Sequence, residues 1–189
     1  MFQLLAHYIK SLTEIDQLSL NIIFSKFSLV KTSRNQLLVD YDDVCQKHYF
    51  VNKGSVRVYT INSEGAETTR YFAFEGEFGT ALPSLIDQKP AFEYLQTIEK
   101  CELLTISRAD FYFLVEEIPQ FALVYRKILE KGFITAQKRI YGFQGFNAME
   151  KVIWIKTHQP KFLLRISNKM AASYLGISPS TLSRMKAKL

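Results

Sequence analysis

The spacing of hydrophobic residues changes twice along the chain, and these changes constrain the fold more than any other feature. Between about Val30 and Ile106, short β-rich runs such as HYFV, SVRVYTI, TTRYFAF and CELLTI are separated by turn-forming clusters that include NKG, NSEG and EGEFG. Helical spacing governs the residues on both sides. Many short strands with Gly-bearing turns are typical of an antiparallel barrel or sandwich. The sequence therefore predicts an α+β fold with an N-terminal antiparallel β-roll of jelly-roll type.

A long helix is predicted after this region. The helical pattern SRADFYFLVEEI leads to Pro119, and no further proline interrupts the chain from there to about Phe143. This helix would carry two apolar rows, each advancing in steps of four and three residues. The first row is Leu129, Phe133, Ala136, Ile140 and Phe143, and the second is Phe121, Tyr125, Ile128, Gly132 and Thr135.

Two apolar rows need two covering surfaces. The β domain can cover one row, and the same helix of a second copy can cover the other, which predicts an isologous homodimer. The alternative is that both rows pack inside one chain. We expect Ile128→Asp to dissociate the dimer, although the sequence does not fix which row faces the partner.

The charge of the chain is concentrated at one end. Residues 1–149 hold 16 Lys or Arg and 17 Asp or Glu, whereas residues 150–189 hold eight Lys or Arg and one acid, Glu150. Such asymmetry predicts a polyanion or an anionic surface as the partner. A solubilising basic tail is the alternative explanation.

The residues from Ser167 onward form a more specific pattern. Ser167 or Asn168 can cap a helix through KMAASYL, and Gly176 can end it in the left-handed conformation. Ser178 can then cap a second helix, with Pro179 at its first position. Two short helices joined by a tight Gly-bearing turn form a helix-turn-helix. The residues predicted to face inward are Ala171, Ala172, Leu175, Ile177, Leu182 and Met185.

The outward face of the second helix is polar and basic, as a helix in the major groove of double-stranded DNA requires. Arg184 is the candidate for reading guanine, because its guanidinium fork matches the O6 and N7 acceptors. A dimer would place two such helices on a pseudo-palindromic operator. The predicted DNA-binding residues are Lys169, Ser178, Ser180, Thr181, Arg184, Lys186 and Lys188. The alternatives are a plain helical hairpin, or a ligand-binding or scaffold protein whose helix-turn-helix docks a protein partner.

The stretch KMAASYLGISPSTLSRMKAKL resembles the C-terminal helix-turn-helix of the Crp–Fnr family of bacterial transcription regulators. YFVNKGSVRVYTINSEGAETTRYFAFEGEFG resembles the cyclic-nucleotide-binding-type barrel of that family, and VEEIPQF resembles the start of its dimerisation helix. The resemblance implies a sensor domain over residues 1–118, a dimerisation helix and hinge over 119–145, and a helix-turn-helix domain without a full wing over 146–189. It also implies base contact by Arg184, phosphate contact by Thr181, and RNA polymerase as a candidate partner.

The resemblance bears on the effector as well. In nucleotide-binding relatives a Gly-Glu-x-Gly segment is followed about a dozen residues later by Arg-Ser or Arg-Thr, which hold the cyclic phosphate together with a helix N-terminus. Gly76, Glu77, Phe78 and Gly79 match the first segment, but Ala91 and Phe92 stand where the Arg-containing pair would be. We therefore predict a degenerate effector pocket that binds neither cyclic AMP nor cyclic GMP. Any effector should be less anionic and should touch Glu77, Phe78 and Phe92, and a true cyclic-nucleotide-responsive regulator is the alternative.

No cofactor or metal is predicted. Two cysteines, Cys45 and Cys101, are too few for an iron–sulfur cluster held by four thiolates, and His7, His48 and His158 form no ligand pair at helical spacing. Haem ligation by Cys45 or His48 stays an alternative. The sequence contains no nucleophile–base–acid set and no phosphate-binding loop, which predicts that the chain is not an enzyme. The N-terminus lacks a signal-peptide pattern and no apolar run reaches about 18 residues, which predicts a cytoplasmic protein with no membrane partner.

Overall fold

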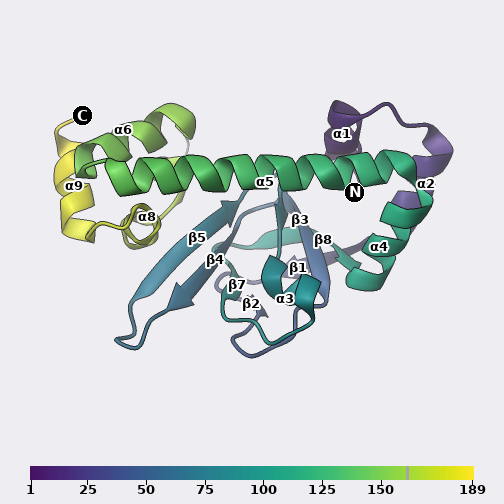
Figure 1. The fold of residues 1–189 in the computed structure, drawn as a ribbon, viewed down its shortest axis with the longest axis horizontal. Coiled ribbons are helices and arrows are strands. Elements are labelled where there is room, and N and C mark those ends of the chain that lie inside the picture. The colour runs from purple at the N-terminus through teal and green to yellow at the C-terminus, as the bar shows by residue number, and fades with distance from the viewer. Residues whose placement is uncertain (161) are drawn as a thin grey trace. The chain divides into compact units, whose positions relative to one another are not determined.

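The computed structural model describes residues 1–160 and 162–189 and contains the predicted order of helices, strands and helices (Figure 1). Two helices and the first strands are α1 (Gln3–Leu12), α2 (Gln17–Ser25), β1 (Ser28–Thr32), β2 (Leu37–Val39), β3 (Lys47–Lys53), β4 (Val56–Ile61) and β5 (Glu67–Ala73). They are followed by β6 (Phe78–Gly79), α3 (Leu82–Asp87), β7 (Tyr94–Thr97), β8 (Cys101–Ser107) and α4 (Arg108–Glu117). The C-terminal helices are α5 (Pro119–Gly145), α6 (Ala148–His158), α7 (Phe162–Arg165), α8 (Asn168–Leu175) and α9 (Pro179–Ala187).

The chain forms two compact units. The N-terminal unit consists of residues Met1–Thr60 and Arg70–Leu129, and the C-terminal unit consists of Ile61–Thr69 and Glu130–Leu189. The chain therefore passes between the units three times, twice in the β4–β5 hairpin and once within α5. The tip of that hairpin belongs to the same unit as the C-terminal helices, which the sequence did not indicate.

Two four-stranded sheets form the β-roll. Their strand orders are β1-β8-β3-β6 and β2-β7-β4-β5. The β1–β8, β3–β8, β3–β6, β2–β7 and β4–β7 pairs are antiparallel, as predicted. The fold class is thus confirmed as α+β with an N-terminal antiparallel roll.

Strand β3 contains the run HYFV, in which exposed polar and buried apolar residues do not alternate. Phe50 lies in a core cluster that the roll shares with α1, α2, α4 and the start of α5, whereas Tyr49 and Val51 lie in a second cluster drawn from both sheets. Successive side chains of a strand point to opposite faces, so β3 is buried on both sides. A strand covered on both faces loses the alternation of apolar and polar residues.

Helix starts follow local capping rules. Asp16 accepts a hydrogen bond from the Ser19 backbone N–H at the start of α2, and Ser107 accepts one from Asp110 at the start of α4. Asn147 and Glu150 form a complete capping box at the start of α6, which places the joint after α5 at residues 146–147. In the part of the chain that the structure describes, no helix is both long enough and apolar enough to cross a membrane.

Candidate nucleic-acid interface and sensor site

The turn between α8 and α9 has the predicted helix-turn-helix geometry. Gly176 adopts φ 65° and ψ 40°, the left-handed conformation that glycine tolerates best, and its N–H donates to the Ala172 carbonyl. The side chain of Ser178 accepts a hydrogen bond from the Thr181 backbone N–H at 3.1 Å, which caps α9. At the start of α8 the cap is Ser167, whose side chain accepts from the Met170 N–H.

Asn168 has a different role, which the sequence did not reveal. Its side-chain nitrogen donates to the Pro179 carbonyl at 2.9 Å and to the Ser183 hydroxyl at 3.0 Å. One amide thus links the start of α8 to the first and fifth residues of α9. These bonds fix the crossing of the two helices at the end of α8 that is distant from the Gly176 turn.

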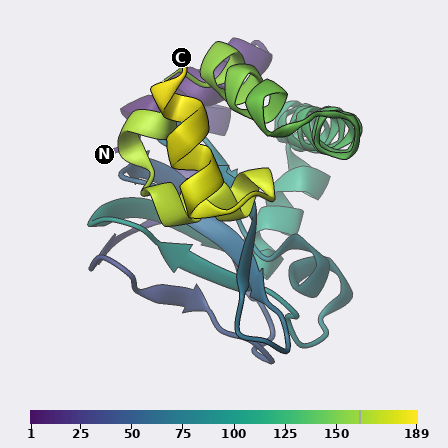
Figure 2. The ribbon, with the colours of Figure 1, turned by 90° about the vertical axis from the view of Figure 1, so that its left-hand side faces the viewer.

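Packing within the C-terminal unit holds α9 in place. Helix α9 packs against α8 and α6. Figure 2 shows the C-terminal helices facing the viewer. Ala171, Ala172, Leu175 and Leu182 are buried as predicted, whereas Ile177 and Met185 are half-buried. Tyr174 is also buried, and its ring packs edge-on against Phe143 of α5 at 5.8 Å between centroids. The inward face therefore leaves the opposite face of α9 to solvent.

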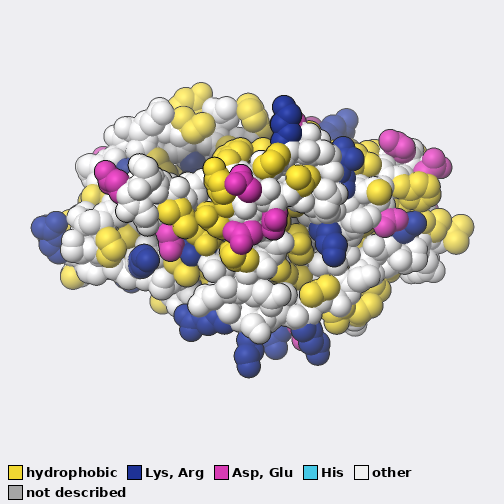
Figure 3. Space-filling model, turned by 90° about the horizontal axis from the view of Figure 1, so that it is seen from below, with side chains coloured by type: hydrophobic (Ala, Val, Ile, Leu, Met, Phe, Trp, Pro, Cys, Tyr) yellow, Lys and Arg dark blue, Asp and Glu magenta, His cyan; other side chains and the backbone are white. Residues whose placement is uncertain are grey.

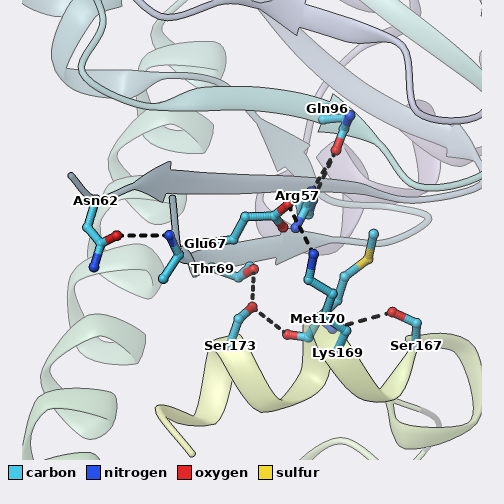
Figure 4. Close-up of polar contacts among 10 residues, drawn as sticks. Arg57, Asn62, Glu67, Thr69, Gln96, Ser167, Lys169, Met170 and Ser173 are labelled. Carbon is cyan, nitrogen blue, oxygen red and sulfur yellow. Dashed lines mark hydrogen bonds and ion pairs between the residues drawn. The ribbon is translucent and has the colours of Figure 1, made fainter. Parts of the chain in front are cut away.

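The predicted DNA-binding residues lie on α8, on α9 and at the two ends of α9. Thr181 is half-buried and the other six are exposed: Lys169, Ser178, Ser180, Arg184, Lys186 and Lys188. Arg184 lies one turn after Thr181, and its guanidinium donates a long hydrogen bond of 3.4 Å to the Thr181 hydroxyl. Lys169 of α8 lies 3.7 Å from the carboxylate of Glu67 on the β4–β5 hairpin (Figure 4).

The two apolar rows of α5 have different surroundings. In the second row Phe121 is buried, and Tyr125 and Ile128 pack against the first core cluster of the N-terminal unit. In the first row Leu129, Phe133, Ala136 and Ile140 are exposed, and Phe133 exposes 66% of its surface. A single chain therefore covers the start of the second row and the last residue of the first row, Phe143, and leaves the other four residues of the first row open. Ile128→Asp would thus disturb the core itself.

The residues of the predicted effector pocket have different surroundings. Gly76 has a φ of 85°, and the Glu77 carboxylate accepts a hydrogen bond from the Phe74 backbone N–H at 3.1 Å. The Phe78 ring packs against Phe50 and Tyr8, whereas Phe92 is 57% exposed. Gly79 and Ala91 adjoin the second cluster, where a Cβ on Gly79 would come within 2.9 Å of Val56. Phe78 is thus half-buried and packs against the first core cluster.

An ion pair with a buried carboxylate lies directly beside this segment. Glu93, which is 1% exposed, follows Ala91 and Phe92, and its two carboxylate oxygens each accept a hydrogen bond of 2.8 Å from Arg70 of β5. A bidentate pair of this kind is among the stronger charge-assisted contacts. The partners are 23 residues apart in the chain, and no local pattern in the sequence marks them.

A second arginine of the roll is also engaged internally. Arg57 of β4 is 4% exposed and donates through Nε and Nη2 to the side-chain oxygen of Gln96 (Figure 4). Its guanidinium also stacks over the Tyr59 ring at 3.8 Å. On the face drawn in Figure 3, exposed hydrophobic side chains lie among charged ones of both signs. Among the described residues, no group of three or more His, Cys, Asp and Glu could hold a metal ion.

His48 and the two cysteines lie inside the roll. His48 is 4% exposed, stacks on Phe111 at 3.9 Å, and has a buried Nε2 without a hydrogen-bond partner. Burial lowers the pKa of His48 to about 3, so its imidazole is neutral at physiological pH. Cys45 and Cys101 are buried free thiols, and burial raises the pKa of Cys101.

Comparison with known proteins identifies the β-roll. Residues 29–117 match the family model described as the cyclic nucleotide-binding domain. No curated protein sequence matches the chain. The match covers the strands from β1 to β8 and helix α4.

Solved structures show the same fold over most of the chain. The c-di-GMP-responsive global regulator CLP of Xanthomonas campestris is 16% identical, with a TM-score of 0.75 over 92% of this chain and 91% of that one. FixK2 of Bradyrhizobium japonicum is 18% identical, with a TM-score of 0.76 over 86% and 84%. A crp/fnr-family protein of Eubacterium rectale is 16% identical, with a TM-score of 0.68 over 92% and 83%. The chain therefore has the fold of the Crp–Fnr transcription regulators, a cyclic-nucleotide-binding-type roll followed by a helix-turn-helix, as the resemblance predicted.

Proposed function

We propose that this chain is a sequence-specific, DNA-binding transcription regulator of the Crp–Fnr type that acts as a homodimer. The observation that carries the proposal is the built helix-turn-helix. Its second helix, α9, is capped by Ser178 and tied to α8 through Asn168, and it exposes Ser180 and Arg184, four residues apart, on one face. Such a helix can place its N-terminal turns against base edges while flanking lysines meet phosphates.

The proposed roles separate residues that read sequence from residues that position the protein. Arg184 would donate two hydrogen bonds to the O6 and N7 atoms of a guanine. Thr181, Lys169, Lys186 and Lys188 would contact phosphates, which carry no direct sequence information. Ser178 would act mainly through the capping of α9, because its hydroxyl is engaged with the Thr181 N–H.

Dimerisation would use the exposed first row of α5. Leu129, Phe133, Ala136 and Ile140 advance by four, three and four residues, the spacing of a coiled-coil seam. A second copy of the same stripe is its simplest cover, since a two-fold axis brings identical surfaces together. A dimer would present two α9 helices to half-sites about one helical turn apart, roughly 34 Å.

The proposal is tested by selecting bound DNA from a random pool with the purified protein. We expect a pseudo-palindromic consensus and an affinity that falls linearly with salt on logarithmic axes, because phosphate contacts release counterions. Recovery of no consensus, together with salt-independent binding to another protein, would favour the alternative in which the helix-turn-helix docks a protein.

The dimer is tested by Phe133→Asp. A charge buried in an apolar seam costs several kcal/mol, so the dimer dissociation constant should rise by about 100-fold or more. Ile134→Asp is the matched control, because Ile134 is 53% exposed and lies about 100° round the same helix. Sedimentation equilibrium that gave identical dimer constants for both variants would reject the first row as the seam.

A further inference from the structure

The tip of the β4–β5 hairpin is a preformed turn. The side-chain oxygen of Asn62 accepts hydrogen bonds from the backbone N–H groups of Glu64 and Ala66, and the Asn62 N–H donates to the Ala66 carbonyl. Gly65 adopts a φ of 78°, which the turn requires. The tip is therefore a shaped element that can present the following residues of β5 in a fixed direction.

Two residues of β5 meet two residues of α8 within the C-terminal unit (Figure 4). The Thr69 and Ser173 hydroxyls are 2.7 Å apart, and the Glu67 carboxylate lies 3.7 Å from the Lys169 ammonium. Glu67 and Thr69 are two positions apart on a strand, and Lys169 and Ser173 are four apart on a helix, so each pair shares one face.

The hydroxyl contact has a defined direction. Ser173 donates its single proton to the Met170 carbonyl at 2.8 Å, so Thr69 must donate to Ser173. Thr69 is fully buried, whereas the side chain of Lys169 is 74% exposed. The contact therefore has a buried anchor at Thr69 and an open, exchangeable ion pair at Glu67.

Lys169 is also a candidate phosphate contact of the helix-turn-helix. The Glu67 carboxylate neutralises the Lys169 ammonium that a phosphate would use, and a carboxylate on a DNA-facing surface repels the phosphate backbone. We propose that the surface of α8 formed by Lys169 and Ser173 is held by this chain's own hairpin through Glu67 and Thr69, in competition with a DNA phosphate, so that the hairpin restrains DNA binding. This inference rests on the proposed DNA-binding function.

The restraint is weak enough to be reversed. An exposed ion pair contributes about 0.2–1 kcal/mol and a neutral hydrogen bond about 1 kcal/mol. Removal of the Glu67 carboxylate should therefore raise DNA affinity by up to about fivefold, and removal of the Thr69 hydroxyl should raise it by about fivefold.

The test compares the affinities of four full-length proteins for the selected DNA at fixed salt: wild type, Glu67→Gln, Thr69→Val and Glu64→Gln. Thr69→Val keeps the volume of the buried side chain and removes its donor. Glu64→Gln is the control, because it removes the same charge from the turn without touching the Lys169 pair. We expect higher affinity for Glu67→Gln and Thr69→Val and a change of less than twofold for the control. An equal increase for both glutamate variants, or no increase for either Glu67→Gln or Thr69→Val, would overturn the inference.

Two further measurements separate the inference from the proposed function. In a Lys169→Ala background the effect of Glu67→Gln should disappear, since the competition then has no ammonium to act on. Hydrogen exchange of the α8 amides, which requires no DNA, should become faster in Thr69→Val. If none of the four proteins binds DNA but hydrogen exchange of the α8 amides is faster in Thr69→Val, the proposed function fails while the hairpin contact stands. Unchanged exchange would reject the contact itself.

Discussion

Strand β5 and helix α9 both carry an arginine, and the two arginines are used in opposite ways. Both side chains reach solvent, but Arg70 gives two 2.8 Å hydrogen bonds to the buried carboxylate of Glu93, whereas the hydrogen bond of Arg184 to Thr181 is 3.4 Å long. A guanidinium that is neutralised by a buried carboxylate contributes to stability and has less capacity left for an external anion. One that is not held by a carboxylate in this way contributes little to stability and is available for recognition.

The largest expected effect comes from the exposed arginine. Arg184→Ala should remove a bidentate base contact worth about 1–3 kcal/mol in each half-site, so a dimer should lose roughly 30-fold or more in specific affinity. The unfolding free energy should stay within about 0.5 kcal/mol of wild type. Binding isotherms on the selected site and on a variant of its guanine measure both the affinity and the preference. If both are unchanged, α9 is not the reading helix.

Arg70, which is held by Glu93, should show the reverse pattern. Arg70→Gln leaves the Glu93 carboxylate buried without its partner, which should destabilise the fold by about 2 kcal/mol, less than for a fully buried pair because half of Arg70 is exposed. Urea denaturation measures the change. The double variant with Glu93→Gln should recover part of the loss, because no unpaired charge is left. A double variant less stable than Arg70→Gln would contradict this account.

The contrast between the two arginines also separates features that can be predicted from sequence from those that cannot. The cap at Ser178, the left-handed Gly176 and the inward Ala172 are local features, and each follows from residues within one or two helical turns. The exposed face of α9 follows from the same periodicity. The order of strands and helices was predictable for this reason, and the confirmed fold follows from it.

Contacts between distant segments could not be predicted in this way. Arg70 and Glu93, Thr69 and Ser173, and Asn168 and Ser183 meet only because the chain folds back on itself. The apolar character of Phe78 was visible, but its burial against Phe50 depends on the position of β6 beside β3. The sequence thus identified the exposed surface of α9 and not the interactions inside the β-roll.

His48, inside the roll, makes the free energy of unfolding depend on pH. Helix α9 contains no histidine. The folded-state pKa of His48 is about 3, below the ordinary value of 6.5, so protons bind the unfolded chain more tightly. Stability from this residue is complete above pH 6.5 and is lost as the pH falls toward 3. At pH 5 the loss should be about 2 kcal/mol.

His48→Phe is the matched variant for this dependence, because it retains an aromatic ring against Phe111 and removes the titrating group. The difference in unfolding free energy between wild type and variant should change by that amount between pH 7 and pH 5. A difference that stays constant with pH would show that His48 does not titrate on unfolding.

A smaller effect is expected from the phosphate contacts. Lys186→Ala should weaken binding to all DNA sequences alike. It should also reduce the slope of log affinity against log salt by about one for each phosphate that is no longer neutralised, and therefore by about two for a dimer. Affinity titrations at several salt concentrations, on the selected site and on random DNA, measure the slope. Weakening confined to the selected site would instead place Lys186 among the residues that read bases.

The smallest expected effect is that of cyclic AMP, which should be none at physiological concentrations. The backbone N–H and carbonyl of Ala91 are already bonded to Asp43 and Asp42, and its methyl side chain is buried, so this position offers no donor to a phosphate. The guanidinium beside it, that of Arg70, is held by Glu93, and a cyclic phosphate would have to displace that carboxylate. An anion left without a partner in a partly buried site costs several kcal/mol.

Calorimetry with cyclic AMP and cyclic GMP should therefore detect no binding, and neither nucleotide should alter DNA affinity. Arg70→Ala should not change this result. If a nucleotide bound with a micromolar dissociation constant and this binding were lost in Arg70→Ala, Arg70 would exchange Glu93 for phosphate. The contrast between Arg70, held by Glu93, and Arg184, available for recognition, would then fail.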